Sequence, residues 1–307
     1  MNKSDLLINE LKRNILNSQD RAVRAFHGRG HYFPELDHLN IEWYPPYLFV
    51  QNFNENLEDE IKRALESIFS ELEYIAAILI QNRTWPELNT YIFLERRPTE
   101  LPLTLWSNLT QNLSCQVTLG KNRNTGVFLD MRAGWDWVQQ HSKGKKVLNL
   151  FSYTSIFSLF ALKGAAESVV NMDMAAGVLK TAQRNHQKND LSDGKAAFYK
   201  RDILKSAQQF SRMGPYDLII IDPPPYQKKS FRGWTDYEKL LVRCERSLNK
   251  GGQLLSCLNN PQISRQVFIE SLKRTFPQAV SFTEIQTSDE IKEVNENKGL
   301  KIVSICF

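Results

Sequence analysis

Cysteine is scarce in this sequence of 307 residues. Only four cysteines occur, and none forms a pair at the short spacing that zinc sites use: Cys115, Cys244, Cys257 and Cys306. A small disulfide-rich fold is excluded and a zinc site is disfavoured, so we expect free thiols in a reducing cytoplasm. The histidines His27, His31 and His38 show no metal-ligand spacing either. We therefore expect no metal.

Long apolar runs are also absent. No run approaches the ~18 residues of a membrane span. Residues 1–19 mix Lys, Arg, Asp and Glu with leucines, unlike a signal or transit peptide. Apolar residues make up 42% of the chain and charged residues 24%, which is ordinary for a globular protein. We expect a cytoplasmic protein of one large or two ordinary domains, with no membrane partner.

Acidic residues are under-represented in the second part of the chain. Residues 1–120 contain 11 Lys+Arg against 16 Asp+Glu, a net charge of −5. Residues 121–307 contain 28 against 18, a net charge of +10. Such an excess is the electrostatic footprint of a polyanion partner. Together with the change in pattern, it places a domain boundary near residue 120, between domains 1–120 and 121–307.

The first domain shows helix and strand patterns without an internal repeat. Apolar residues at helical spacing predict helices over 4–16 and 57–72. Apolar runs between turn residues predict strands over 47–53, 75–81 and 91–95. We interpret this part as a smaller α/β domain, an accessory that faces the substrate.

The second domain alternates strands and amphipathic helices from residue 145 onward. The predicted strands are 146–150, 168–173, 196–199, 218–222, 253–258, 279–286 and 300–307. The predicted helices are 155–162, 175–188, 203–210, 236–248 and 263–275. This alternation predicts a mostly parallel, doubly wound α/β sheet.

The central predicted strand ends on Asp222, which three prolines and Tyr226 follow. Prolines donate no backbone hydrogen bond and fix φ, so strand pairing stops there and a stiff loop begins. Ligands of open α/β sheets bind just beyond the carboxyl ends of strands, which predicts a site at Asp222 and Tyr226. Basic residues flank this site and are placed to hold the phosphates of a polyanion partner: Lys228, Lys229 and Arg232.

Carboxylates recur at the ends of the predicted strands, as Asp173, Asp202 and Asp222. An acid at the second strand of such a sheet is placed to bind ribose hydroxyls, and one after the third could accept from an adenine amino group. Yet the first strand lacks the G-x-G-x-x-G that pyrophosphate binding requires. A dinucleotide is therefore disfavoured, whereas S-adenosylmethionine (SAM), a nucleoside with a short zwitterionic tail, fits this layout.

Three segments together resemble the class I SAM-dependent RNA methyltransferases. They are Leu-Asn-Leu-Phe-Ser-Tyr-Thr at 148–154, Thr-Gly-Val-Phe-Leu-Asp-Met-Arg at 125–132 and Asp-Pro-Pro-Pro-Tyr at 222–226. Within that family the sequence is most similar to the guanine-N7 module of the bifunctional 23S rRNA methyltransferase K/L, which is related to the cytosine-C5 methyltransferase I group. The resemblance covers residues 110–307 well and the amino-terminal half loosely.

The resemblance implies a Rossmann-like, seven-stranded methyltransferase sheet whose last strand is antiparallel. It also implies roles for individual residues. The methionine end of SAM would be lined by Asn149, Phe151, Ser152 and Tyr153. The ribose would be bound by Asp173, the adenine by Asp202 and Ile203, and the transferred methyl would be bordered by Asp222 and Pro223. The residues that would cover the cofactor are Phe128, Asp130 and Arg132. For each aspartate, an exposed helix cap is the alternative, and for Phe151 and Tyr153 it is simple packing.

One position departs from the family pattern. The first loop usually ends in Thr-Gly, whereas this chain has Thr154-Ser155. If the position needs a positive φ, serine is strained there by about 1–3 kcal/mol. Weak cofactor affinity, or an RNA-binding relative without activity, is the alternative that this serine leaves open.

The predicted target atom depends on the cysteine pattern. Methylation of cytosine C5 needs a cysteine nucleophile shortly after the fifth strand. Aligned from Gly251-Gly252, that position is Asn259, and Cys257 falls two residues too early. Guanine N7 has no proton to remove and needs no nucleophile, so we predict guanine N7 of large-subunit rRNA, with Asp222 and Asn259 on the base edge and Tyr226 stacked on the base.

Three alternatives remain open from the sequence. An Asp/Asn-Pro-Pro-Tyr loop is typical of enzymes that methylate exocyclic amines such as adenine N6 or guanine N2, although this chain has one proline more. A non-catalytic RNA-binding factor and a small-molecule or protein methyltransferase are the others. Whether the substrate is free rRNA or a pre-ribosomal particle is left open.

Overall fold

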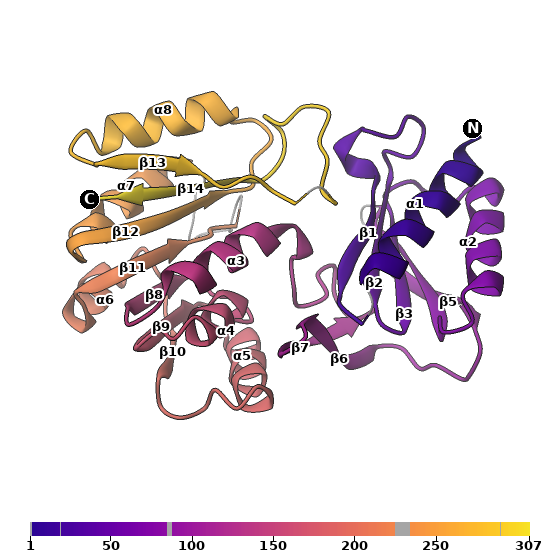
Figure 1. The fold of residues 1–307 in the computed structure, drawn as a ribbon, viewed down its shortest axis with the longest axis horizontal. Helices are drawn as coiled ribbons and strands as arrows, with labels where there is room; N and C mark the ends of the chain where they lie inside the picture. Colours follow the sequence, from indigo (N-terminus) through magenta and orange to yellow (C-terminus); the bar gives the residue numbers. More distant parts are fainter. Residues whose placement is uncertain (1, 19, 85–87, 225–233, 289) are drawn as a thin grey trace. The chain divides into compact units, whose positions relative to one another are not determined.

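The computed structural model describes residues 2–18, 20–84, 88–224, 234–288 and 290–307 (Figure 1). Their contacts divide the chain into two compact units. Unit 1 consists of Met1–Asp130 and Ser288–Asn295, and unit 2 of Met131–Thr287 and Glu296–Phe307.

The division after Asp130 differs from the predicted boundary near residue 120. The loop that follows residue 120 folds back onto unit 1. There the carbonyl of Thr125 accepts a hydrogen bond from the Thr118 amide at 2.8 Å, and the Thr125 Oγ1 lies 2.8 Å from the Tyr44 hydroxyl. The charge pattern carries no signal of these bonds, nor of the return of Ser288–Asn295 to unit 1.

Unit 1 is built on a five-stranded sheet in the order β1-β2-β3-β4-β5, in which β3 and β4 are parallel and the other neighbours antiparallel. The strands are β1 (Val23–His27), β2 (Leu39–Tyr44), β3 (Tyr47–Asn52), β4 (Ala77–Asn82) and β5 (Asn89–Glu95). The other elements are α1 (Lys3–Ser18), the 3-10 turn η1 (Gly28–Gly30), α2 (Asp59–Glu71) and the hairpin β6 (Leu103–Thr110) and β7 (Leu113–Leu119). The turn η2 (Leu129–Met131) begins in unit 1, and its last residue belongs to unit 2.

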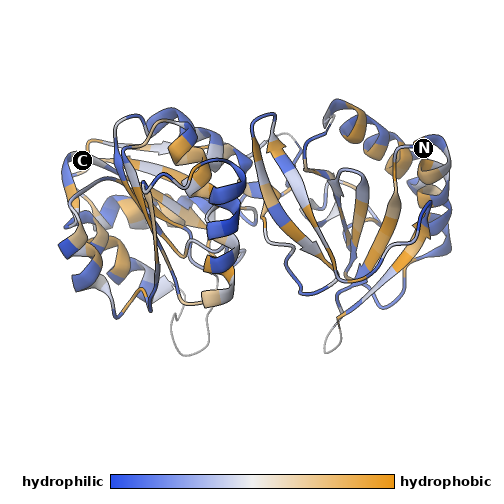
Figure 2. Ribbon diagram, turned by 90° about the horizontal axis from the view of Figure 1, so that it is seen from below, coloured by the Kyte–Doolittle hydropathy of each residue, from blue (hydrophilic) through white to orange (hydrophobic). Residues whose placement is uncertain are grey.

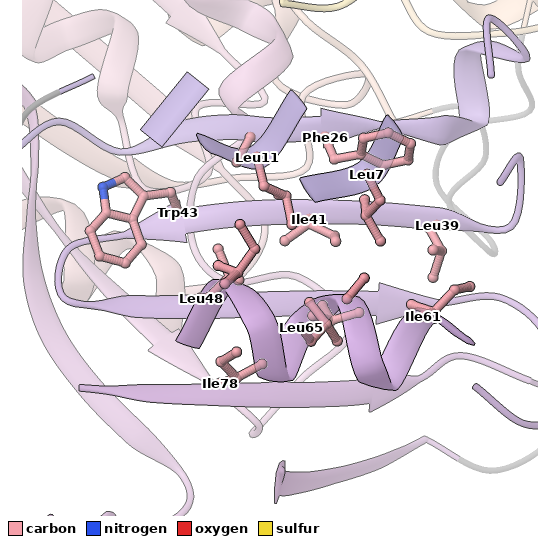
Figure 3. Close-up of a cluster of buried hydrophobic side chains, with 14 of the residues drawn as sticks. Leu7, Leu11, Phe26, Leu39, Ile41, Trp43, Leu48, Ile61, Leu65 and Ile78 are labelled. Carbon is pink, nitrogen blue, oxygen red and sulfur yellow. The ribbon is translucent and has the colours of Figure 1, made fainter. Parts of the chain in front are cut away.

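Helices α1 and α2 pack on one face of this sheet. Figure 3 shows Leu7 and Leu11 of α1, and Ile61 and Leu65 of α2, meeting side chains from the strands in one buried cluster. The helices form because their apolar residues recur every three to four positions, which places them on a single stripe. Burial of that stripe, at roughly 25 cal/mol per Å² of apolar surface, is the main force that holds the helices to the sheet.

Unit 2 contains the seven-stranded sheet that the resemblance predicted, in the order β10-β9-β8-β11-β12-β14-β13 (Figure 1). Strands β10, β9, β8, β11 and β12 are parallel, and β14 is antiparallel to both of its neighbours. The strands are β8 (Lys146–Leu150), β9 (Ser168–Asp173), β10 (Ala196–Lys200), β11 (Tyr216–Ile221), β12 (Leu248–Leu258), β13 (Ser281–Glu284) and β14 (Lys301–Cys306). The predicted fold class is therefore confirmed.

Helices cover both faces of this sheet. On one face Ile219 and Ile221 of β11 share a core with Phe268 and with residues of α6 and α7. On the other face Trp135 of α3 stacks on Phe160 of α4, with ring centroids 5.4 Å apart. The helices are α3 (Arg132–His141), α4 (Ile156–Lys163), α5 (Ala176–Lys188), α6 (Ala207–Met213), α7 (Trp234–Glu245) and α8 (Arg265–Thr275). Figure 2 shows hydrophobic residues concentrated in the strands and hydrophilic ones along parts of the helices.

Two further observations concern what the described residues contain. No helix among them is both long enough and apolar enough to cross a bilayer. Within the same residues, no group of three or more His, Cys, Asp or Glu side chains is arranged to hold a metal ion.

Candidate active site

The carboxyl ends of the parallel strands lie along one edge of the unit 2 sheet. The register pairs Leu150 with Met172 on one side and with Ile221 on the other, so the loops that follow β8, β9 and β11 begin next to one another. The predicted site residues after these strands are therefore brought together at one edge. This is the edge at which open α/β sheets bind their ligands.

The loop between β8 and α4 has an uncommon backbone. Phe151, Tyr153 and Ser155 all have positive φ, at 55°, 49° and 60°. Ser155, which precedes α4 directly, is fully buried in the left-handed region, with ψ at 39°. The position that the family usually fills with glycine thus does require a positive φ in this chain, and serine carries the steric penalty that glycine avoids.

Asp173 at the end of β9 holds this loop in place. One carboxylate oxygen accepts a hydrogen bond from the Tyr153 amide at 2.9 Å, and the other accepts from the Ala175 amide at 2.9 Å. The Ser152 amide also donates to the Met172 carbonyl at 3.0 Å. A carboxylate oxygen has a second lone pair, so Asp173 keeps acceptor capacity for hydroxyl groups of a ligand.

Three polar atoms around the loop have no hydrogen-bond partner among the described residues. They are the Oδ1 of Asn149, the Oγ of Ser152 and the Oγ of Ser155, all of them buried. Leaving such groups unpaired costs about 1–3 kcal/mol each. Their gathering at one loop is the expected signature of a polar ligand that completes the bonds.

Asn149 belongs to a buried hydrogen-bond chain beneath this loop. Its Nδ2 donates to the Asn171 Oδ1 at 2.9 Å, and the Asn171 Nδ2 donates to the Ser158 Oγ at 3.1 Å. The Ser158 Oγ lies 2.8 Å from the His186 Nε2, while the His186 Nδ1 lies 2.8 Å from the Ala182 carbonyl. Since that carbonyl can only accept, the Nδ1 carries the proton and the Nε2 accepts from Ser158. Burial lowers the pKa of His186, which keeps the ring neutral.

Asp202 and Ile203 follow β10. The Asp202 carboxylate accepts a hydrogen bond from the Lys205 amide at 3.4 Å and lies 3.6 Å from the Lys205 ammonium. Both contacts lie within the turn that follows β10. Ile203 is buried in the core of unit 2. The helix predicted over 203–210 instead begins at Ala207, because Ile203 serves the core and the chain turns before α6 starts.

Asp222 and Pro223 follow β11, Asp222 half-buried and Pro223 buried. The Tyr237 hydroxyl of α7 lies 2.6 Å from the Ser256 Oγ and donates to the Cys257 carbonyl at 2.9 Å, which links α7 to the end of β12 beside Asp222. No motif in the sequence pointed to Tyr237. The remaining predicted residues of this loop lie outside the described residues: Tyr226, Lys228, Lys229 and Arg232.

Cys257 and Asn259 occupy the end of β12. Cys257 is completely buried inside the strand and pairs with Ile302 of β14. Burial, and secondarily the Asp222 carboxylate, raises the pKa of the Cys257 thiol well above its ordinary value. Asn259 follows the strand and is exposed. The reactive thiolate that covalent catalysis needs is therefore disfavoured at Cys257.

The segment that precedes β8 contains the other three predicted site residues. Phe128 is 42% exposed and Asp130 lies in η2, both in unit 1. Arg132 begins α3 in unit 2, where it is buried and its guanidinium lies 5.8 Å from the centre of the Trp135 ring.

Comparison with known proteins identifies the family. A family model described as S-adenosylmethionine-dependent methyltransferase matches residues 23–306, most of the chain. The chain belongs to this family. Its cofactor is accordingly SAM, as predicted.

Curated relatives of this methyltransferase carry the name ribosomal RNA large subunit methyltransferase I. The protein of Aeromonas hydrophila is 28% identical over 233 residues, which are 72% of this chain and 57% of that protein. The protein of Pseudoalteromonas translucida is 35% identical over 148 residues, 46% of this chain and 37% of that protein. The chain thus spans about half the length of the curated relatives it matches. The narrower likeness to the methyltransferase K/L module stays a prediction.

Solved structures confirm the fold. The crystal structure of SMU.776, complexed with SAH (S-adenosylhomocysteine), aligns with the whole methyltransferase at a TM-score of 0.83 and covers 82% of that chain at 22% identity. At this identity the likeness concerns the fold.

Proposed function

We propose that this methyltransferase transfers the methyl group of SAM to guanine N7 of large-subunit rRNA. The relatives named above as rRNA methyltransferases support RNA as the substrate, and so does the +10 net charge of residues 121–307. The choice of guanine N7 over cytosine C5 as the methylated atom rests on one observation, the burial of the cysteine thiols. Cys115, Cys244 and Cys257 are buried and Cys306 is half-buried, so the chain offers no exposed thiol as nucleophile.

The proposed cofactor site is the loop between β8 and α4 together with the strand ends beside it. The three unpartnered atoms of Asn149, Ser152 and Ser155 suit the ammonium and carboxylate of the methionine tail. The free lone pairs of Asp173 suit the ribose hydroxyls. In the same proposal the loop residues Phe151 and Tyr153 line the tail, Asp202 and Ile203 face the adenine, and Asp222 and Pro223 border the methyl.

The proposed chemistry needs little from the protein beyond positioning. When bound, SAM supplies an electrophilic methyl on a sulfonium, and guanine N7 has a lone pair with no proton to remove. Asp222 and Asn259 would hold the edge of the guanine, and Tyr226 would stack on it. Correct positioning of two reactants is worth about 7–11 kcal/mol of barrier lowering, so no general base is required. The basic residues Lys228, Lys229 and Arg232 would hold flanking phosphates.

Mass spectrometry of rRNA nucleosides from cells with and without the gene tests this proposal. We expect 7-methylguanosine to be lost without the gene and restored by the wild-type chain, but not by Asp222→Ala. The matched control is Asp193→Ala, which removes an exposed loop acid that pairs with Lys195, two residues further along the chain. Loss of 5-methylcytidine, N6-methyladenosine or N2-methylguanosine in place of 7-methylguanosine would refute the choice of atom.

A further inference from the structure

Unit 1 carries a second group of residues at strand ends, on its own sheet. Strand β1 runs in the same direction as β3, because each is antiparallel to β2, and β3 is parallel to β4. The carboxyl ends of these three strands therefore point to the same edge of the sheet. The residues just beyond them are Arg29, Phe53 and Arg83.

The two arginines meet the same aromatic ring. The Arg29 guanidinium carbon lies 4.1 Å from the centre of the Phe53 ring, and that of Arg83 lies 5.4 Å from it. The Arg83 Nε also donates to the Gln81 Oε1 at 2.8 Å, and its Nη2 donates to the Arg123 carbonyl. Contacts of this kind hold both guanidiniums in fixed positions, so little side-chain entropy is left to lose when a ligand binds.

The turn that carries Arg29 is rigid as well. A Cβ on Gly28 would lie 1.9 Å from the Leu36 carbonyl oxygen, and a Cβ on Gly30 would lie 1.9 Å from the Lys292 carbonyl oxygen. Only glycine permits such close approach of two backbone segments. Arg29 therefore stands between two tightly packed anchors.

This group has an excess of positive charge. Across the described ranges, no carboxylate lies within 4.0 Å of the guanidinium of Arg29, Arg83 or Arg123. The buried acid that acts electrostatically on Arg83, Glu42, already accepts hydrogen bonds from Arg24, Tyr44 and Gln51. Another nearby acid, Glu293, is bonded to His27 at 3.1 Å.

Burial and repulsion between neighbouring cations both act on the guanidinium of Arg83. Burial lowers the pKa of Arg83 to about 10, and the neighbouring cations of Arg123 and Arg24 act in the same direction although Glu42 opposes them. A bound anion would offset both the desolvation and the repulsion.

We infer that Arg29 and Arg83, oriented by Phe53 at this edge of unit 1, bind phosphates of the RNA backbone. The inference rests on the proposed function, in which RNA is the substrate, and it adds an RNA site on the amino-terminal unit to the strand ends of unit 2. Planar guanidiniums match the oxygen geometry of a phosphate, and a site of two or more phosphates is what a nucleic-acid backbone offers.

The test compares RNA binding by Arg29→Met/Arg83→Met with binding by the wild type and by Arg63→Met. Methionine keeps an aliphatic contact with the Phe53 ring and removes the charge. Arg63 is an exposed arginine of α2 in the same unit and serves as the matched control. Binding is measured by fluorescence anisotropy over a series of salt concentrations, with a labelled single-stranded RNA of roughly 12 nucleotides.

We expect the double variant to bind RNA about tenfold more weakly, because two charge-assisted contacts are lost. The slope of log K against log salt should shrink by about 1.4, since each single-strand phosphate contact contributes about 0.7. Arg29→Lys/Arg83→Lys should restore part of the slope. Unchanged affinity and slope in a double variant that melts at the wild-type temperature would overturn the inference, as would an equal loss in Arg63→Met.

Two additional measurements distinguish an RNA site from a site for small anions and from a failure of the proposed function. Titration with inorganic phosphate, followed by thermal melting, reveals a small-anion site. Arginine-dependent stabilisation by phosphate together with unchanged RNA binding would overturn the assignment to RNA. Methyl transfer to rRNA is measured on the wild type alone. If the wild type methylates rRNA while the double variant binds RNA normally, only this inference fails, whereas no transfer by the wild type refutes the proposed function itself.

Discussion

At the scale of single residues, Ser155 connects backbone strain to the cofactor loop. A buried serine with φ at 60° occupies a conformation that glycine adopts without a steric penalty, and its hydroxyl has no partner among the described residues. Both features lower the stability of the free protein. Strain of this sort persists only where the surrounding structure enforces it. Here the hydrogen bond that Asp173 accepts from the Tyr153 amide and the burial of α4 do so.

Replacement of this serine gives a direct prediction. Ser155→Gly should raise the free energy of unfolding by about 1 kcal/mol, because relief of the left-handed strain exceeds the entropy that glycine adds to the unfolded chain. The measurement is urea denaturation. Ser155→Ala is the control, since it removes the hydroxyl and keeps the Cβ, and it should remain less stable than the glycine variant. The reverse order of stability would contradict the strain assigned to this loop.

Asp173 carries a second prediction at this scale. Asp173→Ala removes the acceptor of two backbone amides, so the cofactor loop loses its anchor as well as the proposed ribose contact. We expect the dissociation constant for S-adenosylhomocysteine to rise at least tenfold, about 1.4 kcal/mol, by isothermal titration calorimetry. Asp193→Ala should leave it unchanged. Wild-type affinity in Asp173→Ala would show that the ligand binds elsewhere.

At the scale of elements, the buried chain of hydrogen bonds joins β8, β9, α4 and α5 through neutral His186. Because the folded protein lowers the pKa of this ring, the unfolded chain takes up its proton more readily. Stability from this group is present above the ordinary imidazole pKa of 6.5 and is lost as the pH falls through the lower folded value.

The corresponding prediction concerns unfolding below neutral pH. The free energy of unfolding should decrease between pH 7 and pH 5 in the wild type, and His186→Gln should flatten part of that decrease. His38, whose pKa burial also lowers, contributes with the same sign and remains in both proteins. Equal pH dependence in wild type and variant, measured by denaturation at each pH, would contradict a neutral buried His186.

Several elements could be predicted from the sequence because their residues agree with the local pattern. The strands predicted over 146–150 and 168–173 match β8 and β9, since both are short, mostly apolar runs between turns. Strand β2 was not predicted, although its apolar residues Leu39, Ile41 and Trp43 alternate with polar ones at the two-residue period of a strand. Its Glu42 is buried because it accepts hydrogen bonds from Arg24 of β1. Helix α3 was also not predicted. Its Gly134 weakens the helical signal, although tight packing explains the glycine, since a Cβ there would lie 3.1 Å from the Met131 sulfur.

At the scale of the whole molecule, the seven-stranded sheet of unit 2 and its antiparallel last strand followed from the family resemblance, whereas the make-up of unit 1 depended on contacts far apart in sequence. Residues Ser288–Asn295 return to unit 1, where the Val294 amide donates to the Gly30 carbonyl at 2.8 Å. No local pattern in the sequence announces a partner so distant in the chain. The grouping of Arg29, Phe53 and Arg83 beyond β1, β3 and β4 could not be predicted for the same reason.

This long-range contact is itself testable through two glycines. Gly30→Ala should destabilise the protein by about 1–3 kcal/mol, because the added Cβ meets the Lys292 carbonyl at 1.9 Å. Gly177→Ala in α5, where a Cβ meets nothing within 4 Å, should instead stabilise the protein by about 0.5–1 kcal/mol. Thermal denaturation of both variants checks the contrast, and a harmless Gly30→Ala would contradict the observed packing.

The proposed function depends most on where the cofactor binds, and a crystal structure of this protein with S-adenosylhomocysteine tests that directly. The predicted result is ligand density along the loop from Phe151 to Ser155, with its ribose on Asp173 and its sulfur beside Asp222. Density at any other place in the molecule, with these residues left without ligand contacts, would contradict the proposed cofactor site.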